Sequence, residues 1–116
     1  MTFEVVLRGA QPSDAERFAE ADLVLFGQQA WSASMYLEEI DGPGRTYLVA
    51  EVAGQFAGYA GIWFNGDDAQ LMTIGVLRQW QGQGIARVLL TELTERARRL
   101  GADRMLLEVA VDNDRA

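Results

Sequence analysis

The amino-acid sequence predicts a single α+β domain built on a mixed sheet. Three strand-like segments follow one another with short turns between them, which favours antiparallel pairing. A glycine-bearing turn, a helical segment and another apolar segment come next, and a strand, a crossover helix and a strand form a parallel, right-handed unit. A chain of 116 residues is long enough to bury one core. We therefore expect one domain over residues 1–116, with five strands flanked by helices.

The first strand and the first helix have clear local signals. Residues 3–8 are few and rich in branched side chains, which is typical of a strand. A helix is expected over residues 15–26, and Gly27 ends it. Ser13 and Glu16 have the spacing of a capping box at its start. The residues expected on its buried face are Phe18, Ala21, Leu25 and Phe26.

A second, shorter helix is expected over residues 31–40. Ser32 is placed as its N-cap, and Trp31 precedes it at the position that forms a hydrophobic staple with Tyr36. The segment Asp41-Gly42-Pro43-Gly44 ends this helix. Both helices thus precede the main strands in the chain.

A hairpin and a third antiparallel strand follow the two helices. Ala53-Gly54 is a tight two-residue turn, and Asn65-Gly66-Asp67-Asp68 forms the next turn. Gly58 and Gly61 lie inside the middle strand, where glycine indicates either a bulge or close packing against the first helix. The three strands are expected over residues 47–52, 56–64 and 69–77.

The rest of the chain is organised around the glycine turn, residues 78–87. A helix is expected over residues 84–100, with Gly101 as its C-terminal cap. A fifth strand is expected over residues 105–111, parallel to the strand that precedes the turn. The apolar face of the helix consists of Ile85, Val88, Leu89, Leu93, Ala97 and Leu100.

This turn has the composition of an anion site. Gly82, Gly84 and Ala86 have small side chains or none, so several backbone N–H groups can converge at the positive end of the helix dipole, a place suited to phosphate. No Gly-Lys-Ser or Gly-Lys-Thr follows, which excludes a P-loop, and Arg87 stands where the dinucleotide-binding GxGxxG pattern requires its third glycine. The alternative is that the glycines only form a tight turn between a strand and a helix.

Composition and charge narrow the classes of function. The chain has no cysteine and no histidine, which excludes disulfides, thiolate nucleophiles, Ser-His catalysis and the usual zinc sites. The net charge is −7, and arginine is the only basic residue type. Residues 1–77 hold eleven acids and three arginines, whereas residues 78–116 hold six acids and seven arginines. We therefore expect no nucleic-acid binding and an anionic ligand near Arg78 and Arg87. The acidic part either steers a cationic peptide or amine or only keeps the protein soluble.

Nothing in the sequence indicates export or a membrane. Met1-Thr2-Phe3-Glu4 lacks the basic region of a secretory signal. No apolar run approaches the roughly 18 residues that a membrane-spanning helix needs. We therefore expect a cytoplasmic protein. Because the chain lacks cysteine and histidine, we also expect no bound metal.

Several motifs together resemble a known family. The pattern Gln81-x-x-Gly84-x-Ala86, directly after Ile74-Gly75-Val76, is similar to the acetyl-CoA signature of the GCN5-related N-acetyltransferases. The features that resemble its RimI branch, the N-terminal acetyltransferases of ribosomal proteins, are Ala30-Trp31-Ser32, the loop over 81–87, and Leu106-Leu107-Glu108-Val109 with Asn113 beyond it. The resemblance covers nearly the whole chain and implies the mixed sheet of that family.

The resemblance implies acetyl-CoA as co-substrate and assigns roles to residues of this chain. The backbone of Ile74, Gly75 and Val76 would pair with the pantetheine arm and position the acetyl carbonyl. Asn113 would lie near the cofactor. The pyrophosphate would lie in the turn formed by Gln81, Gly82, Gln83, Gly84, Ile85, Ala86 and Arg87.

Two further assignments have open alternatives. Glu108 matches the general base of the RimI branch, and burial in a cleft would raise its pKa toward that of a usable base. On an alternating strand the same side chain would otherwise point to solvent. Trp31, Met35 and Tyr36 would line a groove for the acceptor peptide, or else belong to the core, as aromatic residues at helical spacing often do.

The activity implied by the resemblance is direct transfer of an acetyl group to a protein N-terminal amine. The family's acceptor is the N-terminal alanine of a ribosomal small-subunit protein. Such a transfer needs no covalent enzyme intermediate, which suits a chain without cysteine or histidine. Two alternatives remain open: acetylation of a small amine or antibiotic, and a non-catalytic CoA-binding domain.

The sequence departs from the family pattern after Asn113. The family continues with a helix that carries a tyrosine general acid and with a final strand pair, whereas the tyrosines here are Tyr36, Tyr47 and Tyr59. We therefore expect a C-terminally truncated domain in which the final helix and strand pair are absent. Its fifth strand would have an unpaired edge, which favours a homo-oligomer through that strand or a lower stability.

Overall fold

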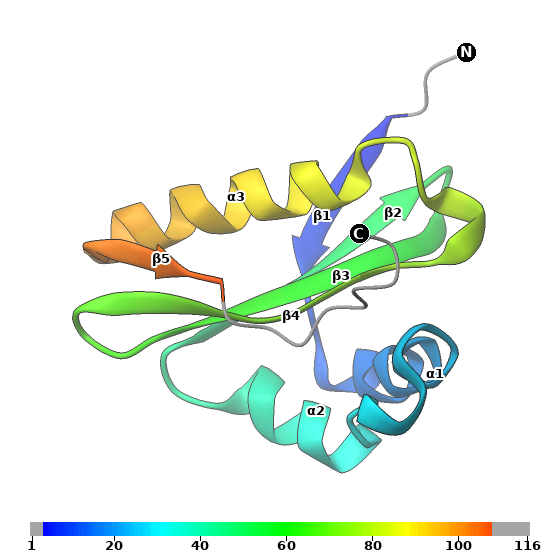
Figure 1. Ribbon diagram of the computed structural model, residues 1–116, viewed down its shortest axis with the longest axis horizontal. Helices are drawn as coiled ribbons and strands as arrows, with labels where there is room; N and C mark the ends of the chain where they lie inside the picture. The colour runs from blue at the N-terminus through cyan, green and yellow to red at the C-terminus, as the bar shows by residue number, and fades with distance from the viewer. Residues whose placement is uncertain (1–3, 108–116) are drawn as a thin grey trace.

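The computed structural model describes residues 4–107, which form a five-stranded sheet with helices on both faces (Figure 1). The strands lie in the order β1-β2-β3-β4-β5, with antiparallel pairs from β1 to β4 and a parallel pair between β4 and β5. The predicted mixed α+β fold is therefore confirmed. The strands are β1 (Val5–Gly9), β2 (Arg45–Val52), β3 (Gln55–Phe64), β4 (Asp68–Val76) and β5 (Arg104–Leu106). The helices are α1 (Ala15–Phe26), α2 (Ala33–Asp41) and α3 (Ile85–Leu100), and the short 3₁₀ turns are η1 (Pro12–Asp14), η2 (Gly27–Gln29) and η3 (Arg78–Trp80).

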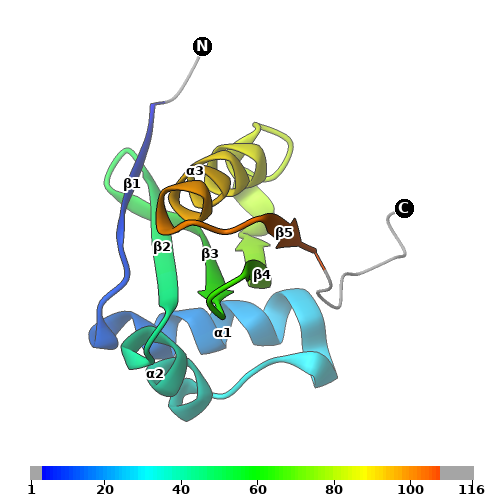
Figure 2. The ribbon, with the colours of Figure 1, turned by 90° about the vertical axis from the view of Figure 1, so that its left-hand side faces the viewer.

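Helix α3 covers one face of the sheet through an aliphatic core, and α1 and α2 lie on the other side (Figure 2). The buried residues of α3 recur every four positions and meet aliphatic residues of β2, β3 and β4. Val88 and Leu100 were expected on this face but are 38% and 48% exposed, because they lie at the flanks of the stripe. The buried stripe of α3 consists of Ile85, Leu89, Leu93 and Ala97.

None of the helices within residues 4–107 is long and apolar enough to cross a membrane.

The opposite face of the sheet carries an aromatic core. The rings of Phe18 and Tyr59 are stacked with centroids 4.8 Å apart, and Tyr36 meets Phe18 edge-on at 5.3 Å. Tyr47 completes the cluster, and its hydroxyl donates to Glu39 Oε1 at 2.6 Å. Because all three tyrosines are buried, their hydroxyl groups must find partners inside the protein.

Most predicted helix ends are confirmed. Gly27 and Gly101 end α1 and α3 with φ angles of 59° and 99°, positive values that glycine adopts without strain. Ser32 is the N-cap of α2, and its hydroxyl accepts the N–H of Met35 at 3.2 Å. The Trp31 ring lies 5.2 Å from the ring of Tyr36, as the staple requires.

The predicted capping box of Ser13 and Glu16 is wrong. Residues 12–14 form a 3₁₀ turn, so Asp14 takes the N-cap position of α1 in place of Ser13. The Asp14 carboxylate accepts the N–H of Gln11 at 2.8 Å and two bonds from Arg8 at 2.9 Å. The Arg8 guanidinium lowers the pKa of Asp14, chiefly through these hydrogen bonds. The Asp14 carboxylate therefore closes the capping box of the 3₁₀ turn with Gln11 and forms an ion pair to β1, and it makes no side-chain cap to α1.

Two bulges interrupt the antiparallel ladders next to the glycines of β3. Ala57 is unpaired between the pairs Ala50–Gly58 and Glu51–Phe56, and Met72 is unpaired between Gly61–Thr73 and Ile62–Leu71. The predicted bulge is thus confirmed, but close packing of these glycines against the first helix is wrong. Gly58 faces α3, and Gly61 faces the ring of Tyr47 on the neighbouring strand.

Strand β5 pairs with the first part of β4 only, as far as the described residues extend. Arg104, Met105 and Leu106 lie beside residues 68–70 of β4, and the Arg104 guanidinium binds Asp68 at 2.9 Å. The part of the predicted strand 105–111 that follows Leu107 lies outside the described residues. Parallel pairing after a crossover helix is confirmed for the part that is described.

We predict that Gly61→Ala destabilises the protein. A Cβ at this position would overlap the Tyr47 ring, which is buried and held by Glu39. Overpacking of this kind typically costs about 1–3 kcal/mol. Gly9→Ala is the control, because no atom lies within 4 Å of a Cβ at Gly9. Urea unfolding should give a lower midpoint for Gly61→Ala alone, and equal midpoints for the two variants would contradict the close approach.

Candidate functional site

The second half of β4 directs backbone groups toward the β5 side of the sheet. The N–H of Leu77 donates to the carbonyl of Ala57 at 2.9 Å, which fixes the phase of the ladder between β3 and β4. Hydrogen-bonded pairs alternate along antiparallel strands, so Ile74 and Val76 face away from β3. The carbonyl of Val76 accepts the Gln81 amide at 2.9 Å, in agreement with this direction. Three of the predicted cofactor residues, Ile74, Gly75 and Val76, therefore lie at the edge where a ligand could extend the sheet.

Gly75 is required by the aromatic core behind the strand. A Cβ at Gly75 would lie 2.6 Å from Cζ and 2.7 Å from the hydroxyl oxygen of Tyr59. Distances under about 3 Å to a fixed ring cannot be relieved without movement of the strand or the ring. The strand at Gly75 therefore rests directly on Tyr59.

The glycine turn joins this strand to α3 and exposes its backbone. Gly82 and Gly84 have φ angles of 81° and 85°, and no atom lies within 4 Å of a Cβ built on either. Gly84 is the N-cap of α3 and has no side chain to cap the helix. The N–H of Val88 is the first to bond within the helix, to the carbonyl of Gly84 at 3.1 Å.

Three backbone N–H groups therefore precede the first helical hydrogen bond, those of Ile85, Ala86 and Arg87. They point out of the N-terminus of a 16-residue helix, where the dipole favours an anion. Ile85 contributes only its backbone, because its side chain is buried in the aliphatic core. This arrangement has the exposed backbone donors that the predicted anion site requires.

Arginines and glutamines surround the turn. Arg87 is exposed in the first turn of α3, and Arg78 is exposed on η3, where it donates to the carbonyl of Val24 at 3.2 Å. Gln81 and Gln83 are also exposed. The bond from the Gln81 side chain to the Val76 carbonyl connects the turn directly to the edge of β4 that, within residues 4–107, no strand covers beyond residue 70.

The residues predicted for the acceptor side divide between the surface and the core. Tyr36 is fully buried, so the core alternative holds for it. Trp31 is half-buried against Tyr36, and Met35 is 45% exposed at the start of α2. Glu108, the predicted base, and Asn113 lie outside the described residues.

Sequence reasoning missed Asp22, a buried carboxylate close to this site. It accepts hydrogen bonds from the hydroxyls of Tyr36 and Tyr59 and from the N–H of Trp31. Burial is the main cause that raises the pKa of both tyrosines. One signal was available, since Asp22 follows Phe18 by four positions and so lies on the predicted buried stripe of α1.

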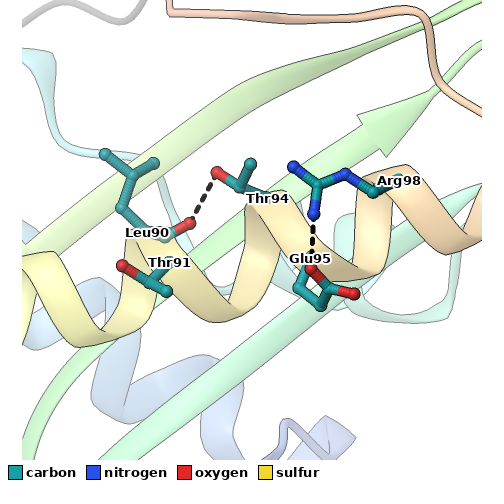
Figure 3. Close-up of a pocket in the computed structure, with 5 residues that line it drawn as sticks. All are labelled: Leu90, Thr91, Thr94, Glu95 and Arg98. Carbon is teal, nitrogen blue, oxygen red and sulfur yellow. Dashed lines mark hydrogen bonds and ion pairs between the residues drawn. The ribbon is translucent and has the colours of Figure 1, made fainter.

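A separate hollow of about 300 Å³ lies on the outer side of α3 (Figure 3). The residues that line it all belong to this one helix, and the hydroxyl of Thr94 is already bound to the carbonyl of Leu90 at 2.8 Å. Arg98 is likewise paired with Glu95. The hollow lacks the convergent free donors of the glycine turn. The hollow is lined by Leu90, Thr91, Thr94, Glu95 and Arg98.

Among residues 4–107, no group of three or more acidic, histidine or cysteine side chains could hold a metal ion.

Comparisons with known proteins agree on one family. The model of the acetyltransferase (GNAT) family matches residues 14–116. The N-alpha-acetyltransferase RimI of Mycobacterium tuberculosis is 37% identical over 120 residues, which cover 99% of this chain and 74% of that protein. The solved ribosomal-protein-S18-alanine N-acetyltransferase of Escherichia coli superimposes with a TM-score of 0.83 at 22% identity, covering 95% of this chain and 70% of the other. An aminoglycoside N-acetyltransferase solved in complex with CoA superimposes with a TM-score of 0.76 at 17% identity, covering 98% of this chain and 82% of the other.

We predict that inorganic pyrophosphate binds at the glycine turn. The free N–H groups before Val88 should take up the anion, so the amide signals of Gly82, Gly84 and Ala86 should shift in a ¹⁵N spectrum as pyrophosphate is added. Gly66, at the far end of β4, is the internal control. Shifts of equal size at Gly66, or none at the turn, would show that these N–H groups do not form an anion site.

Proposed function

The chain belongs to the acetyltransferase (GNAT) family and is an N-acetyltransferase, and we propose that it transfers the acetyl group of acetyl-CoA to the N-terminal α-amine of a ribosomal small-subunit protein that begins with alanine. One observation carries this proposal: a helix N-terminus with free N–H groups directly follows a strand edge that, within residues 4–107, no other strand pairs with beyond residue 70. A single ligand with a phosphate group and a peptide-like arm would match both features: the phosphate would lie at the helix N-terminus and the arm along the strand edge. The acceptor is supported by the name of a relative from Bacillus subtilis that is 32% identical over 113 residues, a putative [ribosomal protein bS18]-alanine N-acetyltransferase.

The residues present fit acetyl-CoA. The turn from Gln81 to Arg87 would hold the pyrophosphate through backbone N–H groups, and Arg78 and Arg87 would add positive charge beside it. The backbone of Ile74 and Val76 would hydrogen-bond the amide-containing pantetheine arm as a neighbouring strand would. Acetyl-CoA supplies an activated thioester, and the chain supplies the positions of the reacting groups.

Transfer requires charge stabilisation and proton removal by the chain's own groups. A backbone N–H at the bulged part of β4 would stabilise the negative charge that develops on the acetyl oxygen. The α-amine must lose a proton before it can attack, and Glu108 is the residue we propose as its base. The excess of acidic residues in 1–77 would attract a positively charged peptide N-terminus.

We predict that acetyl-CoA raises the melting temperature of this chain. A ligand at a hundred times its dissociation constant stabilises the native state by about 2.7 kcal/mol. Gly84→Glu should abolish the shift, because a carboxylate would occupy the anion site. Gly66→Glu is the matched control, since Gly66 is also exposed, with a positive φ and no atom within 4 Å of a Cβ, but lies at the other end of β4. A shift that survives Gly84→Glu would place the cofactor elsewhere.

We also predict that Glu108→Gln lowers turnover with little effect on the binding of acetyl-CoA. Loss of one acid–base group typically costs about 10²–10⁴-fold in rate. The measurement is steady-state transfer to a basic peptide that begins with alanine, with polyamines and aminoglycosides as competing acceptors. Unchanged turnover would show that Glu108 is not the base. Faster transfer to an aminoglycoside than to the peptide would change the acceptor and leave the chemistry in place.

A further inference from the structure

Asp22 is a buried carboxylate that connects three separate parts of the fold. Its residue exposure is 2%, and a charge so placed needs hydrogen-bond partners. Oδ2 accepts the backbone N–H of Trp31 at 3.0 Å, just before α2. Oδ1 accepts the hydroxyl of Tyr36 on α2 at 2.9 Å and the hydroxyl of Tyr59 on β3. One side chain of α1 thus holds α2, the segment before it, and the sheet.

The network continues from Asp22 to β4. Because Tyr36 donates its proton to Asp22, the Thr73 hydroxyl donates to the oxygen of Tyr36, 3.3 Å away. Thr73 directly follows the bulge residue Met72. Tyr59 supports the same strand, since its hydroxyl lies directly against Gly75. Asp22 therefore reaches both ends of the stretch from Thr73 to Gly75 through two tyrosines.

These contacts lie between the two sides of the proposed reaction. The stretch of β4 that would hold the acetyl group is supported at Gly75 by Tyr59 and bonded at Thr73 to Tyr36. On the acceptor side, the half-exposed Trp31 and Met35 lie at the start of α2. Reaction rates fall steeply when reacting atoms are misplaced, by about 100-fold for an error near 1 Å. A carboxylate that ties both sides together controls this spacing.

We propose that Asp22 is a positioning residue for the acceptor amine: it holds the start of α2 at a fixed place relative to the acetyl-binding stretch of β4. The inference rests on the proposed function, because it assumes that an acceptor enters between these elements. Asp22 itself touches neither substrate, since its carboxylate is enclosed by Trp31, Tyr36 and Tyr59. Its effect therefore passes through its partners.

The test uses Asp22→Asn, which keeps the shape of the side chain. The amide oxygen can still accept from the two tyrosines, but the amide NH₂ then faces the N–H of Trp31, so this link breaks selectively. Glu20→Gln is the matched control, because it removes one charge from the exposed side of the same helix. Both proteins are compared with the unaltered chain.

We expect Asp22→Asn to raise KM for an alanine-starting peptide and to lower kcat by about 10- to 100-fold. The melting shift with acetyl-CoA should stay as in the unaltered chain, because the asparagine oxygen keeps the two tyrosine bonds that support β4 and the glycine turn does not depend on Asp22. Selective ¹⁵N labelling of tryptophan adds a readout without substrate: the amide of Trp31 should exchange faster with solvent, and the amide of Trp63 in β3 should not change. Glu20→Gln should match the unaltered protein in all three measurements.

Asp22→Asn with a freed Trp31 amide but unchanged kcat and peptide KM would overturn the inference. If this variant fails to fold, Tyr36→Phe and Tyr59→Phe remove one hydroxyl each and keep the rings, and the same change in peptide kinetics is then expected from both. Normal kinetics in both phenylalanine variants would equally overturn it. Absence of transfer by the unaltered protein to any peptide would overturn the proposed function, and the acceptor role of Asp22 with it.

Discussion

Within residues 4–107, strand β4 is paired on both sides at its start and on one side only near its end. Over residues 68–70 it lies between β3 and β5, whereas Ile74 and Val76 direct their backbone groups away from β3. The bulge at Met72 separates the two parts. It also resets the alternation, so that Ala69 and Leu71 before it and Ile74 and Val76 after it all pack toward α3. The candidate site depends on this change within a single strand.

The two faces of the sheet are built from different materials, and each suits its task. The α3 face is aliphatic, and its packing holds the helix whose N-terminus we propose as the anion site. The opposite face is aromatic and encloses hydroxyl groups, and the carboxylate of Asp22 satisfies two of them. Buried polar groups of this kind allow few alternative arrangements, because each loss leaves an unpaired partner. The face with the directional contacts is the one beneath Gly75.

The sequence predicted the elements well wherever a local signal decided them. The bounds of α1, the N-cap Ser32 and the glycine turn follow from the periodicity of apolar residues and from residues that end or begin helices. It failed where a distant partner decided. Asp14 at the start of α1 binds Arg8 on β1, and Gly61 is needed because Tyr47 lies on the next strand. The position of Asp22 on the buried stripe of α1 could be read from the sequence, but only the fold brings its partner Tyr59 to it. The roles of Glu108 and Asn113 remain predictions.

The hydrogen bond from Gln81 to Val76 has a consequence for how this protein meets other protein chains. A strand that offers a row of free N–H and C=O groups is a template for the strand of another molecule. Here the Gln81 amide occupies the last carbonyl of the row, at the point where an incoming strand would have to donate. A neighbouring strand would therefore lose one bond of its ladder at Val76. The Gln81 side chain thus weakens this end of β4 as a template for a second polypeptide.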